Sequence, residues 1–271
     1  MRLDRALAAR GLARSRTHAQ ALIAAGSVLV DGTTVRRSSH EVSDDAQITL
    51  APTADAYVSR GAHKLNGALD AFGARGLSIA GRACLDAGAS TGGFTQVLLE
   101  RGAASVLAID VGHGQLAPAI AVDPRVTSRE GVNVRDLEPP AAGAGVDLIV
   151  ADLSFISLTL AVEPLVAWLR QDGDMVLMVK PQFEVGAGRL GRGGVVRNPD
   201  DIAEAVASVA RSMIAAGLGI ADVSRSVMSG PRGTVEFFVW GRRTWQAGGE
   251  VQPLDALALT NVIDREVKGS A

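Results

Sequence analysis

The sequence has 271 residues, of which 47% are hydrophobic and 21% are charged. This length and composition are typical of a folded protein with a sizeable core, and they exclude a disordered chain. The formal net charge of −2 excludes a polycation, so any binding of nucleic acid must come from a local basic surface.

The first 50 residues are predicted to form a small unit that begins with two helices. Apolar residues recur at helical spacing over residues 3–8, and Gly11 follows them as a helix-ending residue. Ser15 is expected to cap a second helix, which Gly26 ends because glycine readily adopts the left-handed conformation of a helix C-terminus.

A hairpin is predicted after the second helix. Residues 28–30 are apolar and lead into Asp31-Gly32, a dipeptide typical of two-residue hairpin turns. Residues 33–37 are predicted to return as the partner strand, and residues 48–50 to supply a further short strand. The pattern therefore predicts a small α+β domain over residues 1–50.

The basic residues of this unit are all arginines, since it holds seven arginines, no lysine and five acidic residues. The planar guanidinium group carries a fixed fork of donors that fits a phosphate. By charge alone, a solvated helix face explains these arginines as well as RNA binding does.

Two stretches of the unit carry a more specific signal. Residues 12–16 read Leu-Ala-Arg-Ser-Arg at the opening of a helix, and residues 25–32 read Ala-Gly-Ser-Val-Leu-Val-Asp-Gly. Together they resemble the S-four domain, a module that binds structured RNA, over nearly the whole unit. The resemblance implies that arginines of this unit contact the RNA backbone, namely Arg14, Arg16, Arg36 and Arg37.

A small, polar linker is predicted at residues 51–58, and strand and helix patterns alternate over residues 59–271. This alternation predicts an α/β domain built on a mostly parallel sheet. Short apolar runs suited to buried strands lie at 83–85, 106–109, 148–151 and 175–179, and a closing antiparallel pair is predicted at 218–227 and 234–240. Helices are predicted to begin at Asn198-Pro199 and to span 254–267.

Several kinds of site are not expected. Cys84 is the single cysteine, which excludes an intrachain disulfide and a thiolate metal cluster, and the four histidines show no ligand spacing, so no metal is expected. The most apolar region, 146–169, is interrupted by charged residues and a proline, so no membrane span is expected. No secretory signal is recognised, and the expected location is the cytoplasm.

A glycine-rich turn follows the first predicted strand of this domain. Glycines let a backbone turn sharply and approach a ligand, as in other doubly wound nucleotide sites. Asp86 suits the cationic amino end of S-adenosylmethionine better than a pyrophosphate, and Asp110 ends the next strand, where it can accept ribose hydroxyls. These acids favour a methyl donor over NAD, which is the alternative cofactor. The candidate cofactor residues are Asp86, Gly88, Ser90, Thr91, Gly92, Gly93, Phe94, Asp110 and Asn133, with a surface turn as the alternative for Asn133.

Charged residues stand where buried strands are predicted to end. Asp152 and Lys180 each follow such a strand, and a charged group beside a buried run costs free energy unless it is paired. The carboxyl ends of strands in open α/β sheets are also where ligands bind. Glu236 lies within the last predicted strand, and Lys64 lies at the margin of a helix's apolar stripe. Taken singly, Glu236 suits the exposed side of an edge strand and Lys64 a solvated helix.

The four residues together resemble the Lys-Asp-Lys-Glu set of the FtsJ-like ribose methyltransferases. The strings Ser-Arg-Gly-Ala-His-Lys-Leu at 59–65, Ala-Asp-Leu-Ser-Phe-Ile-Ser at 151–157 and Val-Lys-Pro-Gln-Phe-Glu at 179–184 are similar to the TlyA group in particular. That group is known both as haemolysin-like proteins and as ribosomal RNA 2′-O-methyltransferases. The resemblance implies a Rossmann-like methyltransferase fold, S-adenosylmethionine as cofactor, and cytidine ribose in the RNA of ribosomal subunits as substrate.

The chemistry of ribose methylation accounts for these residue types. A 2′-hydroxyl is a poor nucleophile and must lose its proton as it attacks the methyl group in line with the sulfonium. We expect Lys180 to take the proton or stabilise the developing alkoxide. Asp152 and Lys64 are expected to align the hydroxyl and Lys180, and Glu236 to brace the lysines.

A basic, glycine-rich segment at 186–194 follows the Lys180 strand. It is expected to close over the substrate with Arg189 and Arg192 on phosphates, a plain surface loop being the alternative.

Three other functions compete with ribose methylation. A pore-forming haemolysin is suggested by the group's second name, but neither a membrane span nor a cationic amphipathic helix is predicted. A non-catalytic RNA-binding assembly factor is disfavoured because all four polar positions are filled. A base methyltransferase would carry a catalytic cysteine or an Asn/Asp-Pro-Pro-Tyr-like motif, which this sequence lacks. The methylated nucleotide, the subunit that carries it and the oligomeric state stay open.

Overall fold

The computed structural model describes residues 1–13, 15–50, 57–141, 144–191, 193–230, 233–243 and 252–269. The chain divides into two compact units, Met1–Tyr57 and Val58–Ala271, which are described separately. Most of the linker predicted at 51–58 lies outside the described residues.

The first unit packs two helices against a small antiparallel sheet in the strand order β2-β1-β3. Its core is formed by the apolar faces of these elements. The Ser15 hydroxyl accepts a hydrogen bond of 3.1 Å from the backbone N–H of His18, and Gly26 ends the second helix at a φ of 76°, so both predicted helix boundaries are confirmed. The elements are α1 (Leu3–Ala9), α2 (Arg16–Ala25), β1 (Val28–Val30), β2 (Thr33–Thr34) and β3 (Ile48–Leu50).

The predicted hairpin is confirmed, but its return strand is shorter than expected. Asp31 and Gly32 both have positive φ, at 49° and 79°, as a two-residue hairpin turn requires. The prediction of a strand over 33–37 is wrong, because β2 ends at Thr34. Val35 still donates a backbone hydrogen bond of 3.0 Å to the carbonyl of Val28. Beyond it the Arg36 guanidinium donates to the carbonyl of Ala24 on α2 at 3.3 Å, and a backbone turn follows.

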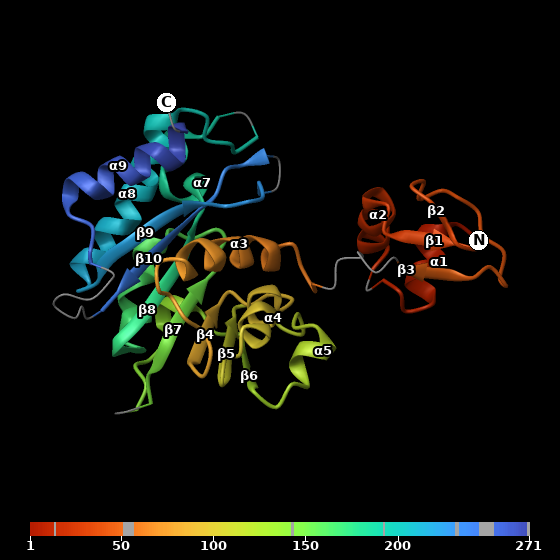
Figure 1. Cartoon of the computed structure of the whole chain (residues 1–271), viewed down its shortest axis with the longest axis horizontal. Helices are drawn as coiled ribbons and strands as arrows, with labels where there is room; N and C mark the ends of the chain where they lie inside the picture. Colours follow the sequence, from red (N-terminus) through yellow and green to blue (C-terminus); the bar gives the residue numbers. More distant parts are fainter. Residues whose placement is uncertain are drawn as a thin grey trace. The chain divides into compact units, whose positions relative to one another are not determined.

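The second unit is built on a seven-stranded sheet in the order β6-β5-β4-β7-β8-β10-β9 (Figure 1). The pairings from β6 through β8 are parallel, and β10 lies antiparallel between β8 and β9. The predicted α/β fold with a closing antiparallel pair is therefore confirmed. The strands are β4 (Ala83–Ala87), β5 (Ser105–Asp110), β6 (Val126–Glu130), β7 (Val146–Ala151), β8 (Leu169–Val179), β9 (Gly219–Arg225) and β10 (Phe237–Arg242).

Helices cover both faces of this sheet. Successive side chains of β10 point to opposite faces, and each packs against a helix. The Trp240 ring packs against Phe72 on one face, with ring centroids 5.6 Å apart, whereas Val239 joins the core that includes Val206 on the other. The helices are α3 (Gly61–Gly73), α4 (Gly93–Glu100), α5 (Pro118–Ala121), α6 (Val162–Val166), α7 (Pro181–Glu184), α8 (Pro199–Ala215) and α9 (Ala256–Lys268). Short 3₁₀ turns are η1 (Val134–Asp136), η2 (Leu158–Leu160) and η3 (Ala187–Arg189).

The predicted start of α8 is confirmed, and that of α9 is displaced by two residues; a side-chain cap defines each. Asn198 accepts a hydrogen bond of 3.0 Å from the backbone N–H of Asp200, with Pro199 in the first position of α8. Asp255 caps α9 by accepting a hydrogen bond of 2.8 Å from the backbone N–H of Ala258, so this helix starts slightly later than predicted.

Strand direction and register determine where the polar residues lie. The parallel strands β7 and β8 both end at the carboxyl edge of the sheet, which places Asp152 and Lys180 there. The antiparallel β10 begins at that same edge, because Phe237 pairs with Val179, the last residue of β8. Glu236, which directly precedes Phe237, therefore stands beside Asp152 and Lys180 at the edge where open α/β sheets bind ligands.

Candidate active site

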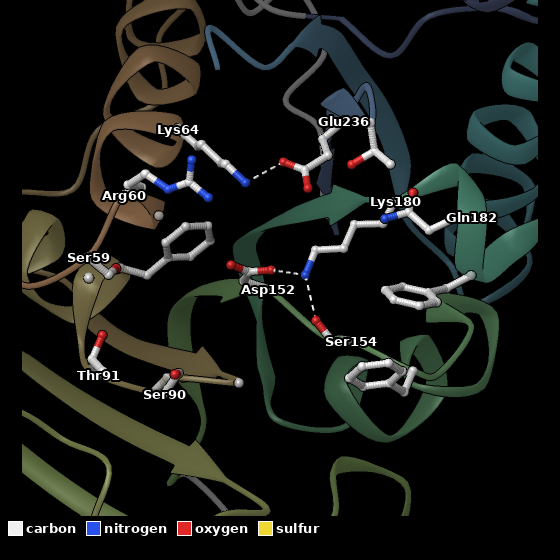
Figure 2. A pocket seen from close by; sticks show the side chains of 18 of the residues that line it. Ser59, Arg60, Lys64, Ser90, Thr91, Asp152, Ser154, Lys180, Gln182 and Glu236 are labelled. Carbon is white, nitrogen blue, oxygen red and sulfur yellow. Dashed lines mark hydrogen bonds and ion pairs between the residues drawn. The ribbon is translucent and has the colours of Figure 1, made fainter. Parts of the chain in front are cut away.

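A cavity of about 530 Å³ opens at this carboxyl edge, beside the first turns of α3. It is lined by Lys64, Asp152, Lys180 and Glu236, so the structure brings the four predicted catalytic residues together around one space (Figure 2). Lys64 comes from α3, far from the other three in sequence, and its side chain extends over the sheet edge instead of into solvent.

The Lys64 ammonium forms a buried ion pair with Glu236. Its Nζ lies 2.5 Å from Glu236 Oε2, and the two residues are 7% and 1% exposed. The expectation for either residue taken singly, a solvated helix or an exposed strand face, is therefore wrong. Glu236 is buried because it lies on the same sheet face as Trp240, the face that α3 covers with Phe72 and Lys64. A charge this deeply buried is costly unless it is paired, so each residue requires the other.

Lys180 forms a second ion pair at the cavity, with Asp152. Its Nζ lies 2.5 Å from Asp152 Oδ1 and donates a hydrogen bond of 2.8 Å to the hydroxyl of Ser154. The side chains of Lys180 and Asp152 are 11% and 25% exposed, so the pair is more accessible than Lys64–Glu236. The cavity thus presents two ammonium groups, each anchored by its own carboxylate.

Close packing beside this cavity requires glycine at two positions. Gly88 has a φ of 83°, and a Cβ atom there would lie 2.6 Å from the backbone oxygen of Asp152. At Gly230 a Cβ atom would lie 2.2 Å from Glu236 Oε1 and 2.4 Å from the hydroxyl oxygen of Thr234. The first glycine lets the turn after β4 approach β7, and the second leaves room for the Glu236 carboxylate.

A second cavity of about 580 Å³ adjoins the first, since Gly88, Ser90, Asp152, Ser154 and Phe155 line both. Asp110 and Asn133, two of the predicted cofactor residues, line this cavity, and their side-chain oxygens accept hydrogen bonds from backbone N–H groups. The Asp110 carboxylate accepts hydrogen bonds from the N–H groups of Ser90 at 2.8 Å and Gly112 at 2.7 Å. Asn133 caps η1 by accepting a hydrogen bond of 3.1 Å from the backbone N–H of Arg135.

The remaining predicted cofactor residues lie at the first cavity or beneath it. Thr91, Gly93 and Phe94 line the first cavity, whereas Gly92 caps α4 with a φ of 93° and is not among the lining residues described. The predicted turn is therefore placed against both cavities.

Asp86 differs from its predicted place. It is fully buried, accepts a hydrogen bond of 2.6 Å from the Thr95 hydroxyl, and is not among the described residues that line either cavity. Burial raises the pKa of Asp86 to about 7, an effect that the Thr95 hydrogen bond opposes. In this structure the Asp86 carboxylate joins β4 to α4 through Thr95. The sequence alone does not indicate this contact, because it depends on how α4 packs against the sheet.

The raised pKa of Asp86 predicts a pH-dependent stability. Between about pH 4, where an unfolded aspartate titrates, and pH 7, the folded protein retains a proton that the unfolded chain releases. The free energy of unfolding should therefore fall as pH rises through this window, by at most about 4 kcal/mol. Asp86→Asn removes the titrating carboxyl and with it this pH dependence. The difference in melting temperature between Asp86→Asn and the wild type should therefore shift in favour of the variant from pH 5 to pH 8. A constant difference would contradict the prediction, and the exposed Asp172→Asn serves as the control.

The predicted RNA-binding arginines are only partly described. Arg14 and Arg192 lie outside the described residues. Arg16 pairs at 2.9 Å with Asp4, a buried carboxylate that also holds Arg2 and Gln20, and Arg36 contacts the Ala24 carbonyl. Arg37 is exposed. Arg189 forms an ion pair of 3.4 Å with Asp201, although Leu190 and Gly194 of the same segment line the first cavity.

An aromatic residue at the cavity mouth was not anticipated. Phe155 is 91% exposed, has a φ of 64°, and lines both cavities. Its ring contacts that of Phe183 with centroids 5.3 Å apart. The sequence feature that could have indicated Phe155 is an aromatic residue shortly after Asp152, the charged residue that follows β7. Other unpredicted lining residues are Ser59, Arg60, Ser154, Gln182 and Thr234.

Comparison with known proteins gives consistent matches for both units. Residues 57–243 match the FtsJ-like methyltransferase family, and residues 1–48 match the S4 domain. The 16S/23S rRNA (cytidine-2′-O)-methyltransferase TlyA of Mycobacterium tuberculosis is 52% identical over 242 residues, which cover 89% of each chain. Hemolysin A of Brachyspira hyodysenteriae is 37% identical over 88% of this chain and 98% of its own.

One solved structure is similar to this chain over nearly its whole length. The structure of a candidate hemolysin from Streptococcus thermophilus has a TM-score of 0.73 and 32% identity, covering 99% of this chain and 96% of that one. Among the described residues, none of the helices is long and apolar enough to cross a membrane.

Proposed function

The chain belongs to the TlyA family of FtsJ-like methyltransferases, and we propose that it transfers a methyl group from S-adenosylmethionine to a ribose 2′-hydroxyl of ribosomal RNA. The observation that carries this proposal is the convergence of Lys64–Glu236 and Lys180–Asp152 on one cavity. A neutral hydroxyl needs proton removal and electrostatic stabilisation to attack a methyl group, and two anchored ammonium groups provide the second directly.

The second cavity and the glycine turn suit the cofactor. The turn after β4 leaves open space beside Gly88 and Ser90, and Asp110 retains acceptor capacity for ribose hydroxyls in addition to its two backbone hydrogen bonds. Because the two cavities share Asp152 and Ser154, an elongated ligand in the second cavity can reach the first. When bound, S-adenosylmethionine supplies a methyl group activated by its sulfonium.

The four charged residues then divide the work on the hydroxyl. The Nζ of Lys180 is fixed by Asp152 and Ser154 at the part of the cavity whose carboxylate is more exposed. As an ammonium group it can stabilise the developing alkoxide, whereas only its deprotonated amine form can receive the proton of the hydroxyl. Lys64, held by the buried Glu236, adds a second positive charge to the cavity. Preorganised charges of this kind stabilise the transition state without reorganisation during the reaction.

Phe155 provides a stacking surface for the base of the target nucleotide. Sequence-specific RNA recognition commonly splays out a base and stacks it on an aromatic side chain. Replacing Phe155 by Ala should raise the KM for RNA about 5- to 150-fold, which corresponds to the usual 1–3 kcal/mol of base stacking. Phe155→Trp should retain most of the affinity, and Val122→Ala, another exposed apolar residue, should leave it unchanged. Equal KM values for Phe155→Ala and the wild type would remove this residue from substrate binding.

The first unit supplies the second contact with RNA, as its S4 match suggests. Its arginines are proposed to bind the RNA backbone, and the shape of the folded RNA to select a cytidine in the small or large ribosomal subunit. The enzyme would then act where ribosomes are, in the cytoplasm.

Methyl transfer to separated subunits tests the proposed function. Purified protein is incubated with tritiated S-adenosylmethionine and with small subunits, large subunits or protein-free ribosomal RNA from cells that lack the enzyme. Incorporation into at least one of these RNAs supports the proposal. Absence of incorporation, combined with leakage of vesicles by the same preparation, would favour the haemolytic activity that the names of two relatives suggest.

A further inference from the structure

The short helix α7 holds the loop of residues 152–158, here called the platform loop, at three successive points. Lys180, which precedes α7, contacts Asp152 and Ser154. Phe183 lies against Phe155. Glu184, the last residue of α7, binds the far end of the loop. The platform loop is thus fastened at its start, middle and end by one five-residue stretch of chain.

The Glu184 contacts are short and use both carboxylate oxygens. Oε2 accepts a hydrogen bond of 2.5 Å from the Ser157 hydroxyl, and Oε1 accepts one of 2.9 Å from the backbone N–H of Leu158. Burial raises the pKa of Glu184, and the hydrogen bonds from Leu158 and Ser157 oppose this rise. Glu184 is not among the described residues that line the two cavities of the candidate active site, so any influence of Glu184 on the reaction must act through the loop.

The conformation of the platform loop needs such a restraint. Phe155 has a φ of 64°, which is uncommon for a residue with a bulky side chain. Strained backbone of this kind persists where the surrounding structure determines it, and it is often found where the geometry serves function. The ring contact with Phe183 restrains the side chain of Phe155, whereas Glu184 restrains the backbone that follows it.

We propose that Glu184 is a positioning residue for methyl transfer: its carboxylate holds the platform loop so that Phe155 and Ser154 stay aligned with Lys180. This inference rests on the proposed function, since it assigns Glu184 to placing the acceptor nucleotide and the reacting lysine. Glu184 touches neither the substrate nor the cofactor in this account. Its loss should therefore affect RNA-dependent steps while leaving cofactor binding unchanged.

The test compares Glu184→Ala and Glu184→Gln with a matched control, Glu266→Ala. Glu266 also accepts a backbone hydrogen bond of 2.9 Å, from Arg225, but it joins α9 to β9 away from the cavities. Ser157→Ala removes one of the two donors to Glu184 and replaces Glu184→Ala if that variant does not fold. The readouts are amide hydrogen exchange of residues 152–158 in the free protein, binding of S-adenosylhomocysteine, and kcat and KM with ribosomal RNA.

Glu184→Ala should increase exchange in the platform loop at least 10-fold and reduce kcat/KM for RNA about 10- to 100-fold, with binding of S-adenosylhomocysteine within twofold of the wild type. Glu184→Gln, which keeps an acceptor for the Leu158 N–H, should recover most of both effects, and Glu266→Ala should show neither. Unchanged exchange and kinetics in Glu184→Ala, or an exchange increase spread over the whole second unit, would overturn the inference. If the wild type methylates no RNA, the proposed function fails, while exchange in the free protein still reports whether Glu184 restrains the loop.

Discussion

Lys180→Ala is expected to reduce the rate of methyl transfer by about 10²- to 10⁴-fold, the range usual for loss of a general acid or base. The ammonium group stands between Asp152 and Ser154 at the cavity, and its partner Asp152 is more exposed than Glu236, the partner of Lys64. Its removal leaves the acceptor hydroxyl without a partner for its proton or its developing charge. Because Lys180 is absent from the lining of the second cavity, the affinity for S-adenosylhomocysteine should stay within about twofold of the wild type.

Single-turnover transfer of tritiated methyl to RNA measures this effect, together with calorimetry of S-adenosylhomocysteine binding. Lys268→Ala is the control, because this lysine also pairs with carboxylates, Asp200 and Asp264, but lies at the end of α9. Lys180→Ala with a rate within threefold of the wild type would show that the hydroxyl is activated elsewhere.

Glu236→Ala is expected to cost about 3–5 kcal/mol of folding stability in addition to activity. It would leave the Lys64 ammonium buried beside the sheet without its carboxylate, and an unpaired buried charge has a cost of this size. Chemical denaturation measures the loss of stability. Lys64→Met should be destabilising for the same reason, since it leaves Glu236 without its cation.

The double variant Lys64→Met/Glu236→Leu separates the two roles of this pair. Replacing both partners by apolar residues of similar size is often neutral for stability, so the double variant should regain most of the stability that either single variant loses. Its methyl transfer should stay as low as that of the single variants, because the cavity then lacks one of its two anchored cations. Recovery of activity with stability would show that the pair is purely structural.

Features determined by local sequence were predicted well. The caps at Ser15 and Asn198, the Asp31-Gly32 turn and the buried strands depend on residues close together in the chain, and the structure has them where they were expected. The end of β2 was predicted less well. Arg36, which follows this strand, contacts Ala24 on α2, and a local pattern does not indicate a contact between two elements.

Features determined by distant contacts were not visible in the sequence. Glu236 is suited to an edge strand when taken alone. It is buried because β10 lies inside the sheet and α3 covers the face on which Glu236 lies. Asp152 and Lys180 were identified from their positions after buried strands, and Lys64 and Glu236 through resemblance to a family. The sequence does not show that Lys64 pairs with Glu236 and Lys180 with Asp152. The exposed ring of Phe155 likewise depends on a left-handed backbone that no local pattern indicates.

The position of the transferred methyl group tests the central proposal most directly. Ribosomal RNA from cells lacking the enzyme is treated with the purified protein and S-adenosylmethionine that carries a deuterated methyl group, then digested to nucleosides and analysed by mass spectrometry. A reaction at the cavity between Lys180 and Lys64 predicts the label on the ribose of cytidine, and its absence with Lys180→Ala. Label on a nucleobase, or equal ribose labelling by the wild type and Lys180→Ala, would contradict the account.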